Sequence, residues 1–476
     1  MAITEQPLFG LGLQGKSPNV TSNHLVNAYY EFQPEKDRTR VVIYGTPGLT
    51  LFVDQGDTPW RGLHQFPKTS KLYGVHRGTF YEIDNAATVT ARGTIGTVNG
   101  RVDITDDGTR IIVVDGTEIY VYDTSTPATP IAAVTDPDRP IAPNTCIFQA
   151  GRILTDEDGT GQFKGSDSYA PTSWNALNFA TAESNPDNVI RIANINGAIA
   201  PFGAYTTEFW QNVGGSGFPY AKMIGADLEY GLAARWSLAR FGGTYSFLAQ
   251  NREGQVIVAM LNGYQIQRIS NSEFEHIINN YSSVADATGF GYMLGGHPMY
   301  QLNFPNQGKS WLDDGSTEFW SELRYGANAR HRAEIGVDFI NRTIVSDYSN
   351  GKLYRLDVNS YTDNGDLIHT ILKGRHIYNL KKNVSIPRLE LGIEAGVGLV
   401  SGQGSDPVAG LRMSKDGGHS FGTQVFAPLG KMGEYTRRCL WRRLGIGRDI
   451  VPEVTITDPV KRVILEATLQ VNDGLS

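Results

Sequence analysis

Residues 414–422, Ser-Lys-Asp-Gly-Gly-His-Ser-Phe-Gly, combine a carboxylate, a hydroxyl and an aromatic ring in one short run. A carboxylate such as Asp416 is the group that glycoside-cleaving enzymes use as acid, base or nucleophile. The same spacing also builds a hairpin turn, in which Asp416 and the Ser420 hydroxyl share turn hydrogen bonds and Gly418 supplies an unusual backbone angle. Phe421 would pack beneath such a turn. None of these roles requires a substrate.

The order of these residues resembles the Asp-box of sialidases, S-x-D-x-G-x-[ST]-[WF]. Sialidase-like enzymes carry several such boxes, an arginine cluster for the substrate carboxylate and a Tyr/Glu nucleophile pair. This sequence holds one box, and it lies outside the repeats described below. We therefore interpret residues 414–422 as a turn and not as part of an active site.

A second possible site for acid and base chemistry is the stretch Phe-Ala-Thr-Ala-Glu-Ser-Asn-Pro-Asp-Asn, where Glu183 and Asp187 stand close together. Glycosidases of the two-carboxylate kind hold their pair about 5–10 Å apart. The chain has 49 acidic residues, so pairs at such a spacing arise by chance. Asn185 and Pro186 between the two carboxylates favour a simple turn.

Metal binding has one candidate, residues 156–167, which place Asp156, Asp158 and Thr160 at positions 1, 3 and 5 of a calcium-loop pattern. The pattern normally ends in a bidentate Glu between two helices, whereas Asp167 ends this one and its flanks are strand and loop. The nine histidines form no zinc motif, and no phosphate-binding loop or nucleophile elbow occurs. We predict no catalytic residue, no metal ligand and no cofactor, so the protein is not expected to be an enzyme.

The strongest charge cluster lies in residues 436–448, Thr-Arg-Arg-Cys-Leu-Trp-Arg-Arg-Leu-Gly-Ile-Gly-Arg. In a strand, side chains alternate between faces, so Arg438, Leu440 and Arg442 would share one face and Cys439, Trp441 and Arg443 the other. One interpretation is a solvated strand with a packed tryptophan. A second is a surface that docks onto an acidic partner subunit, because Arg and Trp are enriched at interface hot spots. Contact with DNA is a third. The interface candidates are Arg437, Arg438, Trp441, Arg442, Arg443 and Arg448.

The elements that would position these residues are short strands joined by glycine turns. A turn followed by an alternating strand recurs with its glycine at positions 78, 116, 151, 203, 263, 315 and 351. Asn-Gly and Asp-Gly pairs supply the positive φ that tight hairpins need. The spacing fits four-stranded blades, and residues 235–270 show the four strands of one blade in sequence. We predict an all-β protein with a β-propeller of about six or seven blades; a pair of β-sandwiches is the rival.

The repeats also divide the chain into parts. Residues 1–45 lack a hairpin and are expected to form an N-terminal arm that packs on something else. Residues 46–380 form the predicted propeller. Residues 381–476 contain strand-like segments without the repeat and are expected to form a C-terminal β-sandwich-like domain.

Composition limits the classes of function. The net charge of −7 argues against a protein that wraps nucleic acid, because that needs a surplus of Lys and Arg. Two cysteines, Cys146 and Cys439, make no disulfide framework, which fits assembly in a reducing compartment. No signal peptide and no apolar run of about 20 residues is visible, so we expect assembly in a cytoplasm and no stable membrane insertion.

Several segments together resemble the packaged-DNA stabilisation proteins of short-tailed phages, also called tail accessory factors or tail hub (nozzle) proteins. The matching segments are YGTPGL at 44–49, FATAESNPDNV at 179–189, TEFWQNVGGSGFPYAKMIGADLEYGLAA at 207–234, MLNGYQIQRIS at 260–270 and CLWRRLGIGR at 439–448. They cover most of the chain in the order of the family. The region SYTDNGDL, 360–367, departs from it.

The resemblance implies a structural protein of the virion tail. Such proteins assemble, as a homohexamer, below the portal and the adaptor, which is the head-to-tail connector. They retain packaged DNA, extend the ejection channel, which DNA contacts transiently, and carry a tail fibre or tailspike and a tail needle or plug. The alternative is a propeller tail protein that binds or hydrolyses a host surface polysaccharide. Several Asp-boxes or a cleft with paired carboxylates would favour that alternative.

Overall fold

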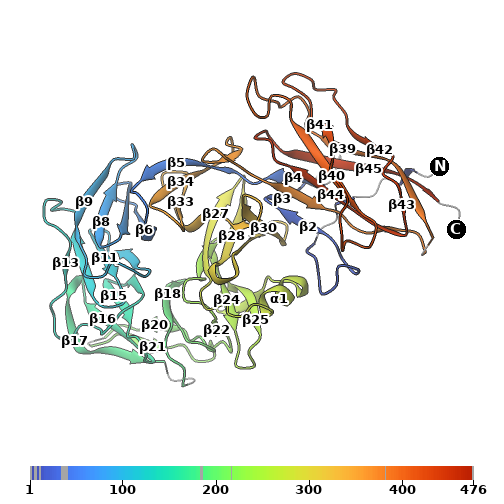
Figure 1. Ribbon diagram of the computed structural model, residues 1–476. Helices are drawn as coiled ribbons and strands as arrows, with labels where there is room; N and C mark the ends of the chain where they lie inside the picture. Colours follow the sequence, from blue (N-terminus) through green and yellow to red (C-terminus); the bar gives the residue numbers. More distant parts are fainter. Residues whose placement is uncertain are drawn as a thin grey trace.

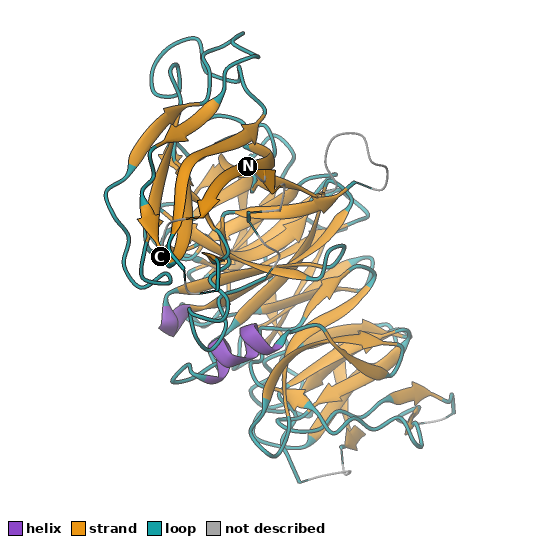
Figure 2. Ribbon diagram, turned by 90° about the vertical axis from the view of Figure 1, so that its right-hand side faces the viewer, coloured by secondary structure: helices purple, strands orange, loops and turns teal. Residues whose placement is uncertain are grey.

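The computed structural model describes residues 3–4, 8–9, 12–33, 41–182, 186–215, 217–380 and 382–473. Strands make up almost all of its regular structure (Figure 2). These residues include a single α-helix, α1 (Ser272–Asn279), and a single 3-10 turn, η1 (Pro305–Gln307). The Asn271 side chain begins α1 by accepting a hydrogen bond from the Phe274 amide. No helix in the described part of the chain is long and apolar enough to cross a membrane.

Small antiparallel sheets surround a common axis in the larger part of the molecule, which is the arrangement of a β-propeller (Figure 1). Blades are numbered here in chain order. Blade 1 consists of β6 (Trp60–Phe66), β7 (Lys71–His76), β8 (Thr79–Ile83) and β9 (Val89–Thr94). Blade 2 consists of β10 (Asp103–Asp106), β11 (Arg110–Val114), β12 (Ile119–Asp123) and β13 (Ala132–Ala133). Blade 3 consists of β14 (Cys146–Gln149), β15 (Arg152–Asp156), β16 (Gln162–Asp167) and β17 (Ala170–Thr181). Blade 4 consists of β18 (Arg191–Ile195), β19 (Ala198–Phe202), β20 (Trp210–Asn212) and β21 (Tyr220–Lys222).

Three further blades complete the ring. Blade 5 consists of β22 (Gly231–Leu232), β23 (Ala239–Phe241), β24 (Thr244–Gln250), β25 (Val256–Asn262) and β26 (Gln265–Arg268). Blade 6 consists of β27 (Thr288–Leu294), β28 (His297–Phe304), β29 (Lys309–Asp314) and β30 (Phe319–Tyr325), with β31 (Ala329–Arg330) paired to β30. Blade 7 consists of β32 (Ala333–Asp338), β33 (Thr343–Asp347), β34 (Lys352–Asp357) and β5 (Gly48–Asp54), followed by β35 (Thr362–Asp363) and β36 (Asp366–Leu367). The described chain thus forms a propeller of seven blades, within the range that the glycine turns predict.

The seven glycine turns fall one in each blade, although not at the same place in each. Gly151 and its neighbour Ala150 both have positive φ and join the first two strands of blade 3. Gly263 instead follows β25 and leads into the last strand of blade 5. The four strands of blade 5 within residues 235–270 confirm the expectation for that segment. The number of these turns therefore equals the number of blades, but a turn does not occupy the same position in every blade.

Blade 7 is completed by a strand from the beginning of the chain. β5 lies antiparallel to β34, with Leu356 opposite Leu49 and Lys352 opposite Asp54. Trp60, in the first strand of blade 1, donates its indole hydrogen bond to the Gly351 carbonyl at 2.8 Å. Because β5 and β34 come from opposite ends of the propeller segment, their pairing fastens the ring.

The smaller part of the molecule is a β-sandwich of two sheets (Figure 1). One sheet contains β1 (Ile3–Thr4), β3 (Ala28–Phe32), β4 (Val41–Gly45), β45 (Val463–Asp473), β39 (Val384–Ile393), β42 (Cys439–Arg442) and β43 (Ile446–Gly447). The other contains β2 (His24–Val26), β37 (Thr370–Lys373), β44 (Asp449–Ile456), β40 (Val408–Ser414), β41 (Val425–Pro428) and β38 (Ile377–Tyr378). Leu389, Ile386, Val454 and Trp441 belong to the apolar core between them.

Two features of this sandwich differ from the organisation expected of the sequence. β3 and β4 pair with each other and, through β4, with β45, so much of the expected arm lies inside a sandwich sheet. Strand pairing also passes from the propeller to the sandwich between β36 and β37, ahead of position 380. Both differences arise from pairing between distant parts of the chain, which local patterns do not report.

A single strand joins the two parts. β2 pairs parallel to β30 of blade 6 and antiparallel to β37 of the sandwich, so one sheet continues from blade 6 into the sandwich. Glu322 on β30 is buried beside β2, where it contacts His24 at 2.7 Å and Lys309 at 2.7 Å. Asn27 adds hydrogen bonds from its side-chain amide to the carbonyls of Arg324 and His369, both at 3.0 Å. These contacts fix the sandwich to the propeller.

Candidate assembly interface

The turn at residues 414–422 lies between β40 and β41 of the sandwich. Asp416 accepts hydrogen bonds from the Ser414 hydroxyl at 2.6 Å and the Ser420 hydroxyl at 2.5 Å, and from the His419 amide at 3.1 Å. These hydrogen bonds, with that of Ser414 first, hold the pKa of Asp416 well below its usual range. Gly418 has φ of +92°, which is the angle that the turn requires. The carboxylate therefore serves the hairpin.

The other acidic motifs also make local structural contacts. Asp187 accepts hydrogen bonds from the Tyr205 amide at 2.9 Å and from the amide and hydroxyl of Thr206 at 3.1 and 2.9 Å. Glu183, its possible partner, lies outside the described residues. Asp187 thus holds a turn of blade 4.

In the calcium-like loop, the carboxylates have separate partners. Asp156 is buried and accepts from the Thr145 amide and hydroxyl at 2.6 and 2.9 Å, and burial raises its pKa. Asp158 pairs with Arg235 at 3.2 Å, whereas Asp167 accepts from Ser173 at 2.7 Å. No group of three or more possible metal ligands occurs among the described residues.

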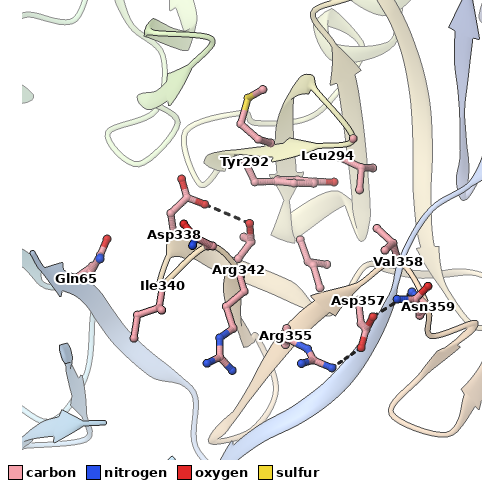
Figure 3. Close-up of a pocket in the computed structure, with 15 residues that line it drawn as sticks. Gln65, Tyr292, Leu294, Asp338, Ile340, Arg342, Arg355, Asp357, Val358 and Asn359 are labelled. Carbon is pink, nitrogen blue, oxygen red and sulfur yellow. Dashed lines mark hydrogen bonds and ion pairs between the residues drawn. The ribbon is translucent and has the colours of Figure 1, made fainter. Parts of the chain in front are cut away.

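A groove of about 770 Å³ lies between blades 6 and 7 (Figure 3). Asp338 accepts a hydrogen bond from the Thr343 hydroxyl at 3.2 Å, and Asp357 pairs with Arg355 and accepts from the Asn359 amide at 3.0 Å. Asp338 is exposed, and each carboxylate is engaged by a residue of its own hairpin or loop. The groove therefore differs from the paired, partly desolvated carboxylates of a glycosidase.

The arginine and tryptophan segment forms β42 and the loops around it. Trp441 and Cys439 point into the sandwich core, and Trp441 is only 2% exposed. Its indole nitrogen donates to the Val425 carbonyl at 2.9 Å. Arg442 stands opposite Arg388 of β39 on the outer face. Alternation thus places Trp441 inside, as part of the fold, and leaves the arginines to face outward.

The outer face of β39 and β42 is basic. Arg438 forms a two-pronged ion pair with Glu390, which also contacts Arg388 at 2.9 Å. The hydrogen bond from Arg438 lowers the pKa of Glu390. Four further arginines are exposed and have no ion pair within the described part of the chain: Arg437, Arg442, Arg443 and Arg448. Arg443 has φ of +58°, which ends β42 and turns its side chain away from the alternation.

The sandwich also exposes apolar residues, which sequence reasoning missed. The loops before and after the β40–β41 hairpin meet where the Gly433 amide donates to the Gly396 carbonyl at 3.2 Å. They present Tyr435, which is 76% exposed, and Val400, which is 84% exposed. Phe426 of edge strand β41 is 62% exposed. Apolar residues set among glycines and charges, as in Gly430–Tyr435, were the signal available in the sequence.

Together these residues are the candidate for contact with another subunit. β41 and β42 are edge strands of the two sandwich sheets, and the Trp441–Val425 hydrogen bond brings the two edges together. The candidate assembly interface is defined as the exposed arginines around β42 together with the exposed apolar residues of β41 and the adjoining loops. Mixed arginine and apolar surfaces of this kind suit protein contacts better than nucleic-acid wrapping.

Comparisons with known proteins agree with this two-part architecture. A family model described as "Bacteriophage P22 Gp10, beta-propeller" matches residues 7–361, and one described as "Bacteriophage P22 Gp10, beta-sandwich" matches residues 369–472. No curated protein matches the chain.

Solved structures are similar to this chain at low identity. The WD40 β-propeller domain of Doa1 is 13% identical, with 65% of this chain and 96% of that chain covered and a TM-score of 0.40. The Neurospora crassa Pan2 WD40 domain is 9% identical, with 65% and 95% covered and a TM-score of 0.43. The extracellular domain of the one-component system BT4673 from B. thetaiotaomicron is 8% identical, with 82% and 48% covered and a TM-score of 0.44. Identities this low do not bear on function.

Proposed function

The chain belongs to the bacteriophage P22 Gp10 family and is a structural protein of a phage tail; from this premise we propose that it forms a homohexameric ring below the portal and adaptor. The ring retains packaged DNA, extends the ejection channel and carries a fibre or tailspike and a needle or plug. The protein does this by shape and contact, without catalysis, and is assembled in the host cytoplasm. The observation that carries the ring proposal is the candidate assembly interface.

The distribution of charge supports contacts between unlike surfaces. Residues 46–367 hold 35 acidic and 23 basic residues, whereas residues 368–476 hold 10 acidic and 15 basic residues. The propeller is therefore acidic and the sandwich basic. In a closed ring, each subunit presents one surface to its neighbour and receives a different one. A basic sandwich facing an acidic propeller of the next subunit satisfies that requirement and sets the direction of the ring.

The apolar residues supply the second part of the contact. Exposed charge pairs contribute little free energy because water and salt screen them. Burial of Phe426, Tyr435 and Val400 would contribute most of the free energy of association, at about 25 cal/mol for each Å² of apolar surface removed from water. The arginines then set orientation and the apolar residues hold the subunits together.

An acidic propeller also suits the passage of DNA. A surface with surplus negative charge repels the phosphate backbone and gives DNA no continuous row of cations to bind. Retention of DNA would therefore depend on closure of the tube by partner proteins and not on tight binding to its wall.

Charge reversal of Arg442 and Arg443 to glutamate tests the ring. Both side chains are exposed, so the fold should be retained, while capture of the protein onto purified adaptor rings and formation of hexamers should be lost. Native mass spectrometry and negative-stain imaging report both. Reversal of Lys68 and Arg77 on the propeller makes the same change in net charge and serves as the control. Full assembly of the Arg442/Arg443 variant, or turnover of a host polysaccharide by the isolated protein, would contradict the proposal.

A further inference from the structure

The axis of the propeller contains a cavity of about 280 Å³. Its walls come from the innermost strands β6, β10, β18, β23, β27 and β32 and from the residues just before them. Glycines allow these strands to approach closely; a side chain at Gly291 would lie 1.9 Å from the Arg240 carbonyl oxygen. The cavity is therefore a built feature of the closed ring and belongs to no single blade.

Two arginines and a tryptophan meet in this cavity. The Arg101 guanidinium lies over the Trp236 ring at 5.0 Å from the ring centroid, and the Arg191 guanidinium lies over the same ring at 5.1 Å. Arg101 precedes blade 2, Arg191 begins blade 4 and Trp236 precedes the β23 strand of blade 5. Since blades 2 and 5 are not neighbours in the ring, the contact between Arg101 and Trp236 crosses the axis.

The guanidinium of Arg101 lacks acceptors within the described part of the chain. Its Nε and Nη1 atoms are buried and have no hydrogen-bond partner there, and the same is true of Nε of Arg191. The other nitrogens of Arg191 make only long contacts, 3.4 Å to the Arg235 carbonyl and 3.5 Å to Asp103. A buried guanidinium without acceptors is costly, because it has lost its water and gained nothing in exchange.

A neighbouring arginine shows how the same fold treats a guanidinium that serves structure. Arg61, also buried in the propeller, donates hydrogen bonds of 2.7–2.8 Å to the carbonyls of Gly100, Arg77, Thr97 and Asn99 and to the Thr97 hydroxyl. Arg61 thus has an acceptor for each guanidinium nitrogen. By contrast, Nε and Nη1 of Arg101 are left free to bind an acceptor from outside the chain.

The acidic groups at or near the cavity already have partners, including Asp338, which lines it and accepts a hydrogen bond from the Thr343 hydroxyl at 3.2 Å. Asp103 accepts a hydrogen bond from the Cys146 amide at 3.0 Å, and Glu334 accepts from the Thr288 hydroxyl at 2.9 Å and pairs with Arg330. Burial lowers the pKa of Arg101, against the opposing effects of Glu334 and Asp103. Donors without acceptors therefore face a small cavity at the propeller axis.

We propose that the axial cavity is an oxyanion-binding site, in which the guanidinium groups of Arg101 and Arg191 bind a phosphate group while Trp236 holds both in place. The volume admits a phosphate group. A planar guanidinium presents a fork of N–H donors that matches the oxygens of a phosphate. The phosphate is either a free ion or part of a nucleic acid backbone, and the two sources are separable by experiment. The site lies within one chain, so it does not depend on formation of the hexameric ring.

Binding of inorganic phosphate to the full-length protein is measured by isothermal titration calorimetry at constant ionic strength. We expect one binding event per chain, weakened at least tenfold by Arg101→Gln and by Arg191→Gln. Lys68→Gln removes an equal charge at an exposed position of the propeller and should bind like the unaltered protein. Arg101→Lys keeps the charge but loses the fork, and intermediate affinity is expected.

A short single-stranded oligonucleotide in place of inorganic phosphate distinguishes the sources. Binding of the oligonucleotide that requires Arg101, without binding of inorganic phosphate, assigns the site to a nucleic acid backbone. Binding of inorganic phosphate that requires Arg101 assigns it to the free ion. If neither ligand shows a dependence on Arg101, the proposal is overturned.

Thermal unfolding without phosphate tests the role of Arg101 even when phosphate binds too weakly for calorimetry. Removal of an unpaired buried charge should raise the midpoint temperature in Arg101→Gln, because functional groups of this kind lower stability. Addition of phosphate should raise the midpoint of the unaltered protein and leave that of Arg101→Gln unchanged. A lower midpoint in Arg101→Gln without phosphate would mean that Arg101 is a structural residue, and would contradict the proposal.

Discussion

Asp363 shows how strongly one buried side chain can respond to its surroundings. It lies on β35, is 2% exposed, and its Oδ1 atom has no hydrogen-bond partner within the described residues. Burial raises its pKa to about 7, despite the opposing charges of Arg332 and Arg462. Asp416, in a turn that supplies several hydrogen bonds, shows the reverse shift in pKa. The same carboxyl group therefore titrates differently according to the donors that the fold supplies.

Asp363 makes stability depend on pH near neutrality. The folded state holds this proton up to about pH 7, whereas the unfolded chain releases it near 3.8, so the free energy of unfolding falls as pH rises between those values. Asp363→Asn should flatten this dependence and stabilise the protein at pH 8 by about 2–4 kcal/mol. Urea unfolding across pH 4–8 measures the free energy of unfolding and its dependence on pH. Asp338→Asn, at an exposed position of the same blade, is the control, and an equal effect of both variants would count against the explanation.

Trp441 and Arg442 are adjacent but differ in role. Trp441→Ala empties a site in the sandwich core and should destabilise the protein by about 3–5 kcal/mol. Arg442→Ala alters an exposed side chain and should leave the free energy of unfolding nearly unchanged while weakening assembly. Chemical denaturation of the isolated chain compares the two. A surface tryptophan would instead tolerate alanine, so a small loss at Trp441 would contradict this placement.

At the scale of the elements, β2 and β5 do most to unite the molecule. β5 completes blade 7, and β2 links blade 6 to the sandwich. Both strands come before blade 1 in the chain, so the N-terminal segment must pair with later strands before either the propeller or the sandwich is complete. The propeller and the sandwich are consequently expected to unfold together.

Glu322 is the central group of the link through β2. Burial by itself would raise the pKa of Glu322, but the hydrogen bonds and charges of His24 and Arg324 hold that pKa well below the usual value of 4.5. Stability from this group is present above about pH 4.5 and is lost as pH falls below it. Glu322→Gln should destabilise the protein by about 1–3 kcal/mol, because the partly buried Arg324 and Lys309 lose a buried anionic partner.

Hydrogen exchange locates the effect of Glu322→Gln. Amides of β2 and β37 should lose protection in this variant, since the connecting sheet is weakened there. Glu253→Gln changes an exposed carboxylate of blade 5 and should leave protection unaltered. Loss of protection confined to the outer strands of the propeller would contradict the role assigned to Glu322.

At the scale of the whole molecule, the opposite charges of the propeller and the sandwich govern how copies meet. The attraction acts over about 8–10 Å at physiological salt and becomes shorter as salt increases. We expect the rate of ring assembly to fall at least tenfold between about 50 and 500 mM salt, while dissociation changes less, because apolar contacts hold the formed ring. Light scattering after rapid mixing of the protein into buffers of different salt concentration measures the rate of assembly. Assembly that is insensitive to salt would leave the charge asymmetry without a role.

Several features followed from local sequence. Glycine turns and alternating strands predicted an all-β propeller, and they did so because each hairpin is specified by neighbouring residues. The hydrogen bonds of the Asp416 turn were predicted for the same reason. Spacing also placed Cys439 and Trp441 on one strand face, but it could not say that this face is the core, because alternation is equal for both faces.

The sequence alone therefore determined the class of fold and limited the propeller to about six or seven blades. The tertiary structure decided that β5 closes the ring, that β2 to β4 enter or join the sandwich, and that Arg101 meets Trp236 across the axis. The physical reason is the range of the interactions. Turn preferences and alternation act over a few residues, whereas these contacts join segments up to hundreds of residues apart and exist only once the ring has closed.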